Sequence, residues 1–329
     1  MSRKGLTHED YTFRRIKSAI LGFVVGDAMG VPAEFMSRDT LKADPVTDMR
    51  SGGVHNQIAG TWSDDTSMTL CMMESLTEKG VDYADQMERF TNWLLNAAYT
   101  AHDEVFDVGG ATKTAIFNYA KHIAPLECGG KSDYSCGNGS LMRILPLALF
   151  LYRKYHPYGL DENIANTIHS ASMCTHAHRR CQMACGVYSS VVFQAFRGGN
   201  MKETIKWGVR SALSYYKEQD EFSEVFGDFQ SLETIDKWEE QQIQSSGYVL
   251  HTLQAALWCL LTTEGYAECI LKAVNLGDDS DTTAAVVGGL AGLWYDENTI
   301  PANWIGQLAK AGDIEKRAAR FAYACMELK

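Results

Sequence analysis

The sequence predicts an all-α protein. Apolar residues recur three and four positions apart in segment after segment, first at Ile16, Ile20, Phe23 and Val24, a spacing that places them on one face of a helix. The alternating pattern of a half-buried strand is scarce, and β-branched runs between turn signals are almost absent. The helical spacing returns over residues 90–95, 141–151, 184–196, 249–261 and 282–295. We therefore expect these segments to form the core.

Length and composition predict one domain. The chain has 329 residues, 46% of them hydrophobic, which is enough to bury a sizeable core. No Pro/Gly/Ser-rich linker divides the chain, so residues 1–329 are expected to fold as a single compact unit. Within this unit we expect residues 1–13 to form a short N-terminal arm. The stretch 216–246, which is rich in Glu, Asp and Gln, is expected to be a solvated acidic insertion.

The net charge, the absence of targeting segments and the cysteine pattern limit the kinds of partner and the compartment expected for this protein. The 30 basic and 41 acidic residues give a net charge of −11, and no long basic run is present, which argues against nucleic-acid and anionic-membrane surfaces. The first fifteen residues lack the apolar core of a signal peptide, and no run of about 20 mainly apolar residues suggests a membrane span. Nine cysteines without a C-x-x-C pair are typical of reduced thiols. We expect a cytoplasmic protein, most simply a monomer.

Glycine- and polar-rich junctions interrupt the predicted helices at six places. A plain helical core does not need so many breaks, and loops carried on a rigid scaffold are where binding and catalysis usually occur. The junctions span residues 26–35, 60–68, 106–114, 136–143, 174–178 and 275–283.

Two of these junctions have the same acidic layout before a helix. Helix capping is one explanation, because Ser, Thr and Asp are favoured at helix starts. A single such residue suffices for capping, however, and crowded carboxylates repel one another, a cost that hard divalent cations would offset. Both explanations remain open from the residues alone. If the two clusters meet, they offer oxygen ligands for a pair of Mg²⁺ or Mn²⁺ ions from Ser63, Asp64, Asp65, Asp279, Asp281 and Thr282.

Taken together, the six junctions resemble the ordered motifs of the ADP-ribosylglycohydrolase family, which includes dinitrogenase reductase-activating glycohydrolase and the ADP-ribosylarginine hydrolases. The resemblance extends over about residues 16–323, and the ordered set is far more specific than one S-D-D-T motif. It implies a single orthogonal bundle of helices around a central cleft that holds two Mg²⁺ or Mn²⁺ ions. It also implies hydrolysis of the bond between C1″ of an ADP-ribose and an acceptor, commonly an arginine side chain of a modified protein.

The resemblance also implies roles for individual residues. Glu34 falls where the family has a glutamate that binds or polarises the attacking water, and Asp65 counts as both a metal ligand and a catalytic carboxylate. Asp107 would lie beside the substrate and recognise the guanidinium or the adjoining ribose, which favours arginine over serine, nucleic-acid and small-molecule acceptors. Asp27 is expected to cap a turn. The residues expected to bind the ADP-ribose are Gly109, Gly110, Asn138, Gly139, Ser140 and His176.

Two other functions remain as alternatives. A protein with the same scaffold could only bind ADP-ribose or neutralise a toxin as an immunity protein, and the acidic stretch 216–246 would then be the candidate surface. A prenyl-diphosphate or terpene synthase would also place aspartates on helices. Those enzymes need a D-D-x-x-D stripe, and here Ser67, Met68 and Thr69 follow the acidic pair, which argues against this class.

Overall fold

The computed structural model describes residues 8–328. Over this part of the chain it has fifteen α-helices, eight short 3₁₀ helices and no strand, which confirms the all-α prediction. Residues 8–13 of the expected N-terminal arm belong to the first helix, and the rest of that arm lies outside the described residues. The α-helices are α1 (His8–Gly30), α2 (Arg38–Ala43), α3 (Asp64–Lys79), α4 (Tyr83–Asn96), α5 (Gly110–Ala120), α6 (Leu145–Tyr155), α7 (Glu162–Met173), α8 (Arg179–Ala195), α9 (Met201–Lys217), α10 (Ser223–Phe229), α11 (Val249–Leu261), α12 (Tyr266–Val274), α13 (Ser280–Tyr295), α14 (Ala302–Gln307) and α15 (Ala311–Met326).

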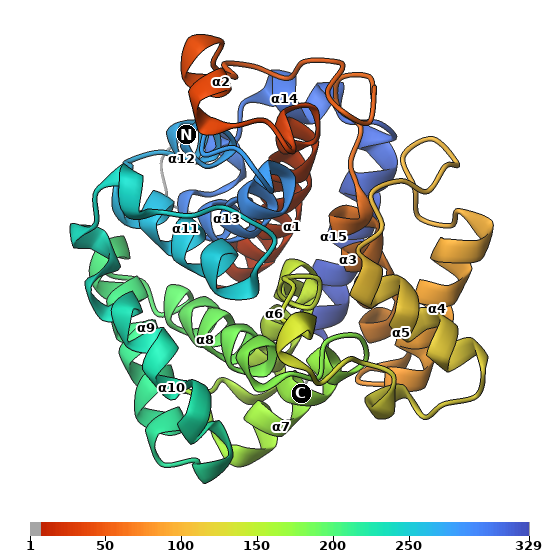
Figure 1. Ribbon diagram of the computed structural model, residues 1–329, viewed down its shortest axis with the longest axis vertical. Coiled ribbons are helices and arrows are strands. Elements are labelled where there is room, and N and C mark those ends of the chain that lie inside the picture. The colour runs from red at the N-terminus through yellow and green to blue at the C-terminus, as the bar shows by residue number, and fades with distance from the viewer. Residues whose placement is uncertain (1–7, 329) are drawn as a thin grey trace.

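The α1 and α13 helices form an antiparallel pair at the centre of the fold (Figure 1). Glycines one helical turn apart line their contact, and a Cβ added at Gly22, Gly26 or Gly288 would overlap a backbone carbonyl of the other helix. Because glycine carries no side chain, the two backbones approach more closely than side-chain packing would allow. The α12 helix and the α11 helix pack against α13, and α15 packs against α1.

This close pairing determines what meets at one end of the pair. The C-terminus of α1 lies against the N-terminus of α13, where the Ser280 hydroxyl donates a 2.9 Å hydrogen bond to the Gly30 carbonyl. Just beyond, the Phe35 N–H donates to the Asp278 carbonyl at 2.7 Å. The residues that follow α1, including Glu34, are therefore held beside the acidic start of α13.

The start of α3 is fixed at the same place by Asp27 on α1. Its carboxylate accepts hydrogen bonds from the N–H groups of Ser63, at 3.0 Å, and Thr66, at 2.9 Å. These N–H groups have no partner within α3, since they belong to its first turn. Asp27 thus caps α3, as the sequence predicts, and brings the first acidic cluster next to the second.

The segment Glu9–Ala33, which contains most of α1, is long and apolar enough by length and composition to cross a membrane. The sequence-based expectation that no such run exists was therefore wrong. In the structure, 94% of the apolar window is buried by the protein's own helices. This burial accounts for its composition, because a central helix that is covered on every side is apolar all round.

Residues 216–246 contribute to the core as well as to the surface. Tyr216, Phe222 and Phe229 are fully buried, and Ile235 packs beside them. The Glu and Asp residues between them face solvent. The acidic composition therefore describes only the outer face of this segment, which covers α9 and α11 through α10 and a run of 3₁₀ turns.

Replacing Gly288 with alanine is expected to lower the free energy of unfolding by about 1–3 kcal/mol, because the added Cβ would overlap the Gly22 carbonyl and push α1 from α13. Urea unfolding followed by far-ultraviolet circular dichroism measures this. Gly312→Ala in α15 is the matched control, since a Cβ there meets open space, and it should be neutral or slightly stabilising. Equal midpoints for the two variants would contradict the proposed constraint.

Candidate active site

The two acidic clusters meet, although they lie more than two hundred residues apart in the chain. The Thr282 hydroxyl donates a 3.0 Å hydrogen bond to Oδ2 of Asp65, across a sequence separation of 217 residues. The Ser63 hydroxyl donates to the same oxygen at 3.1 Å. Both hydroxyls expected to bind a metal therefore contact Asp65, which is fully buried.

Carboxylate oxygens gather here in two groups suited to a metal ion. Asp27, Asp65 and Asp281 form one group, and Glu34, Asp279 and Asp281 form the other; in each group the candidate ligand atoms lie within 4.8 Å of one another. From the sequence, Asp27 was expected only to cap a turn. Its place among the candidate metal ligands was not predicted.

The hydrogen bonding of the buried carboxylate oxygens indicates whether these residues could bind a cation. Oδ1 of Asp65 and Oδ2 of Asp281 are buried and have no hydrogen-bond partner among the described residues. A buried carboxylate oxygen without a partner is costly, and hard cations such as Mg²⁺ or Mn²⁺ prefer oxygens of this kind. The residues present therefore fit a metal site.

Burial and mutual repulsion perturb the carboxyl groups strongly. Burial is the largest cause that raises the pKa values of Asp64, Asp65 and Asp281 well above their ordinary range, and neighbouring carboxylates add to it. Burial, followed by the charge of Asp107, raises the pKa of Glu34 to about 10. No lysine or arginine is among the described residues that line this site, so positive charge has to come from elsewhere.

A cleft of about 340 Å³ opens onto the carboxylates. Asp64, Asp279, Thr282, Glu34 and Asp107 line it, whereas Ser63, Asp65 and Asp281 lie buried behind its wall. Five of the six residues expected to bind the ADP-ribose line the same cleft: Gly109, Gly110, Asn138, Gly139 and His176. The sixth, Ser140, lies behind the wall, fully buried, where its hydroxyl accepts a 2.8 Å hydrogen bond from Ser172.

Polar hydrogen bonds hold Asn138 and His176 in the wall of the cleft. The Asn138 side-chain amide donates to Oδ2 of Asp279 at 2.7 Å and to the Thr252 hydroxyl at 2.9 Å. Burial lowers the pKa of His176 to about 3, so its ring is neutral near pH 7, and Nδ1 contacts the Thr175 hydroxyl at 2.8 Å. This wall therefore presents neutral polar groups.

Arg143 is structural, and its hydrogen-bond partners are backbone carbonyls. Its guanidinium donates to the carbonyls of Gly139 and Ala171 rather than to a core carboxylate. It is almost fully buried, and it lies over the Phe90 ring at 5.1 Å. Arg143 thus fixes the backbone of the loop that lines the cleft.

Sequence reasoning missed His55, which contacts two residues of the site. Nε2 of His55 lies 2.6 Å from Oε2 of Glu34 and 3.8 Å from Oδ1 of Asp107. His55 stands outside the six junctions, and its only sequence signal is its place after two glycines, shortly before the first acidic cluster. Two exposed aromatic side chains at the cleft, Phe35 and Tyr134, were also missed.

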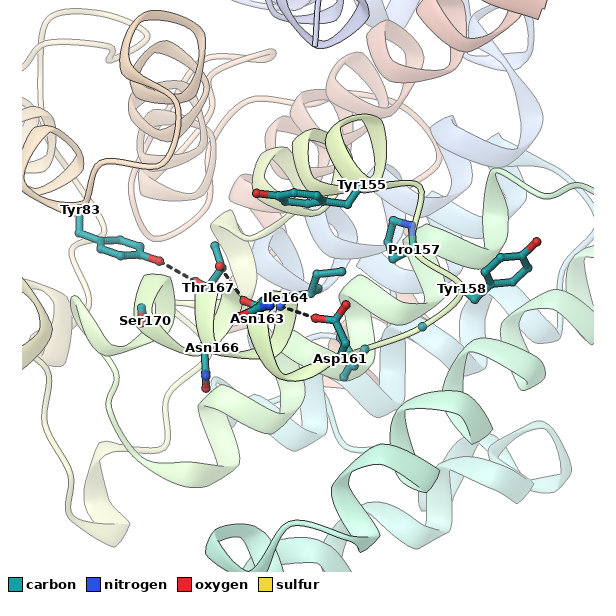
Figure 2. Close-up of a pocket in the computed structure, with 12 residues that line it drawn as sticks. Tyr83, Tyr155, Pro157, Tyr158, Asp161, Asn163, Ile164, Asn166, Thr167 and Ser170 are labelled. Carbon is teal, nitrogen blue, oxygen red and sulfur yellow. Dashed lines mark hydrogen bonds between the residues drawn. The ribbon is translucent and has the colours of Figure 1, made fainter. Parts of the chain in front are cut away.

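A larger cavity lies elsewhere and lacks such chemistry. It measures about 840 Å³ and lies between α4, the end of α6 and α7, with Tyr83, Tyr155 and Tyr158 on its wall (Figure 2). Its one carboxylate, Asp161, caps α7 by accepting a 2.9 Å hydrogen bond from the Ile164 N–H. Without paired ionisable groups, this cavity is not the catalytic candidate.

Comparison with known proteins agrees with the geometry. The sequence model of the ADP-ribosylglycohydrolase family matches residues 8–328. The chain belongs to the ADP-ribosylglycohydrolase family. Members of this family are glycosyl hydrolases, so the predicted enzyme class is confirmed.

Among its relatives, this ADP-ribosylglycohydrolase is 31% identical to ADP-ribosylarginine hydrolase Tri1 of Pseudomonas putida, over 92% of this chain and 76% of that one. It is 30% identical to ADP-ribosyl-[dinitrogen reductase] glycohydrolase of Rhodospirillum rubrum, over 89% of this chain and 90% of that one. A solved structure described as an ADP-ribosylglycohydrolase-related protein complex is similar with a TM-score of 0.74 and 29% identity. That match covers 96% of this chain and 99% of that one.

When a chelator removes divalent metal ions, the free energy of unfolding of the protein is expected to fall as the pH rises from 7 to 8. Carboxyls with raised pKa values, such as Glu34 at about 10, hold protons in the folded state that the unfolded chain has already released. Each such carboxyl contributes a slope of about 1.4 kcal/mol per pH unit. The buried histidines do not affect this window, because their unfolded state is mainly neutral above pH 7.

Urea midpoints at pH 7 and pH 8 measure this slope. Glu34→Gln and Asp65→Asn should each flatten it, and so should added Mg²⁺ or Mn²⁺. A slope that is the same in the wild-type protein and in both variants would show that these carboxyls do not hold the protons.

Proposed function

We propose that the protein is a metal-dependent hydrolase of the cytoplasm that removes ADP-ribose from ADP-ribosylated arginine on a protein by cleaving the N-glycosidic bond at C1″. The hydrogen bond between Thr282 and Asp65 is the main support for this proposal, because it joins the two acidic clusters into one site. The names of the relatives from Pseudomonas putida and Serratia proteamaculans, ADP-ribosylarginine hydrolase, support arginine as the acceptor.

The proposed cofactors are two Mg²⁺ or Mn²⁺ ions. The residues that would hold them are Ser63, Asp64, Asp65, Asp279, Asp281 and Thr282. When bound, such ions supply positive charge that polarises sugar hydroxyls and water. The buried oxygens of Asp65 and Asp281 without partners support this assignment.

Glu34 is the group in place to accept a proton from the attacking water. Its side chain is 4% exposed and lies beside the Asp279–Asp281 group at the edge of the cleft. Burial and the charge of Asp107 favour its protonated form, and cations held by the neighbouring aspartates would favour the carboxylate instead. Glu34 thereby becomes a base suited to proton transfer near neutral pH.

Asp107 would bind the leaving guanidinium. It is half-buried on the cleft wall, next to the glycines that begin α5. A carboxylate pairs with a planar guanidinium through charge-assisted hydrogen bonds. As the bond to C1″ breaks, positive charge develops on the ribose, and the surrounding carboxylates stabilise that charge electrostatically.

The two alternative functions are less well supported. A purely binding or toxin-neutralising protein has no need for a buried carboxylate set with unpartnered oxygens, and this set is present. The prenyl-diphosphate class is disfavoured by the match of the whole described chain to a different family. We therefore infer that the carboxylates serve hydrolysis.

Asp64→Asn and Asp281→Asn should each lower the release of ADP-ribose from ADP-ribosylated arginine by roughly 100-fold or more, because each removes charge needed to hold a cation. Mass spectrometry of the released ADP-ribose measures the rate. Asp278→Asn is the matched control, since Asp278 is exposed and its left-handed φ of 53° suits asparagine. Normal turnover by Asp281→Asn would count directly against the proposal.

Asp107→Asn should raise KM for an arginine conjugate by about 10- to 100-fold, because the negative charge and one of the two acceptor oxygens that pair with the guanidinium are lost. A serine-linked conjugate, which has no guanidinium, should be affected little. Asp103→Asn is the control, since Asp103 lies on the same loop with a similar φ of 58° and pairs with Lys310. An equal loss with both conjugates would exclude guanidinium recognition by Asp107.

A further inference from the structure

His55 lies between two loops that carry the proposed catalytic groups. Nε2 of its ring is 2.6 Å from Oε2 of Glu34 and 3.8 Å from Oδ1 of Asp107. The ring also lies between two aromatic side chains, 6.1 Å from the Phe35 centroid and 5.1 Å from the Phe106 centroid. One side chain thus contacts two adjacent residues on each loop.

A tight turn places His55 in this position. Gly52 and Gln57 exchange two backbone hydrogen bonds, at 2.7 and 3.1 Å, and so close the turn that carries the histidine. Gly53 has a φ of 72°, and its Cα lies so close to Pro32 that a Cβ would meet the proline backbone. Gly53 therefore lets the turn pack directly against the segment that leads to Glu34.

The two contacted loops are strained next to the catalytic groups. Phe35 has a φ of 61° and Asp107 a φ of 51°, in the left-handed region that non-glycine residues, and bulky ones above all, adopt at a cost. Strained residues persist only where the surrounding contacts hold them. His55 contacts both of these residues, and its side chain is only 16% exposed.

We propose that His55 is a positioning residue that joins Glu34 to Asp107 and sets the distance between the two. This inference rests on the proposed function, in which Glu34 handles the attacking water and Asp107 the leaving guanidinium. Glu34 also lies within 4.8 Å of the ligand atoms of Asp279 and Asp281. The His55 contact therefore fixes a carboxyl group that the metal site and the leaving-group site share.

The role of the ring nitrogen can be separated from the role of the ring as packing. His55→Phe keeps an aromatic ring between Phe35 and Phe106 but loses the nitrogen. His55→Gln loses the ring and keeps a side-chain N–H at a similar reach. We expect His55→Phe to lower kcat by about 10- to 100-fold, because a misplaced Glu34 slows the chemical step. KM should rise less than in Asp107→Asn, because the charge of Asp107 remains. His55→Gln should restore kcat to within about threefold of wild type.

Full activity of His55→Phe would overturn the proposal. So would a loss in His55→Gln as large as in His55→Phe, because a side-chain N–H at this position would then not be sufficient to restore activity. The same substitutions at His122, an exposed residue just after α5, are the matched controls and should leave kcat unchanged.

Amide hydrogen exchange tests the positioning role without depending on hydrolysis. Residues 31–37 and 104–109 should both exchange faster in His55→Phe than in wild type, and His55→Gln should restore their protection. Unchanged exchange in both segments would overturn the proposal. If exchange responds as expected and the wild-type protein releases no ADP-ribose, the proposed function fails while the role of His55 in joining the two loops stands.

Discussion

The close contact of α1 with α13 is the constraint on which the site depends. Glycines at Gly22, Gly26 and Gly288 let the two backbones touch, so the helix ends are aligned within a narrow tolerance. Glu34 follows the end of α1 and Asp281 lies at the start of α13, and both belong to one group of carboxylates. Because cores transmit small displacements rather than absorb them, a shift between these helices would separate the two ligands. On the proposed function, the glycine contact therefore has a functional role as well as a packing role.

The same arrangement concentrates negative charge in the interior at a cost in stability. Burial without a positively charged partner raises the pKa of a carboxyl group and so favours its protonated form. Asp65 accepts hydroxyl hydrogen bonds from Ser63 and Thr282 at one oxygen, while its other oxygen has no partner. The hydroxyls therefore offset only part of the cost of burial. Sites with this character are where a fold sacrifices stability for chemistry.

The elements of the fold were largely predictable from the sequence, because helical periodicity is a local property. The prediction for residues 249–261 coincides with α11, and residues 282–295 lie within α13. Periodicity says nothing of the partner of each helix, so the meeting of Asp65 with Thr282 was accessible only through the family resemblance. The acidic composition of 216–246 concealed buried aromatic residues, because composition averages over the two faces of a segment.

The residues that were missed share a physical reason. His55 acts through contacts with Glu34 and Asp107, which are remote in the chain, and a single histidine in a turn carries no periodic or spacing signal. The partners of Arg143 show the same dependence on the fold, because a buried guanidinium pairs with backbone carbonyls as readily as with carboxylates, and only the fold decides between them. Residues whose role depends on another side chain are therefore the last to be found from a sequence.

The charge distribution of the cleft links the proposed cofactors to the proposed substrate. ADP-ribose carries a diphosphate, yet no lysine or arginine is among the described residues that line the cleft. On the proposed function, the attraction for an anion would come from the N–H groups at the start of α5, near Gly110, and from bound cations. Without cations, the carboxyls of Asp64 and Asp279 would repel the diphosphate wherever they are ionised. On the proposed function, metal ions therefore contribute to substrate binding as well as to the chemical step, and the two contributions depend on the same aspartates.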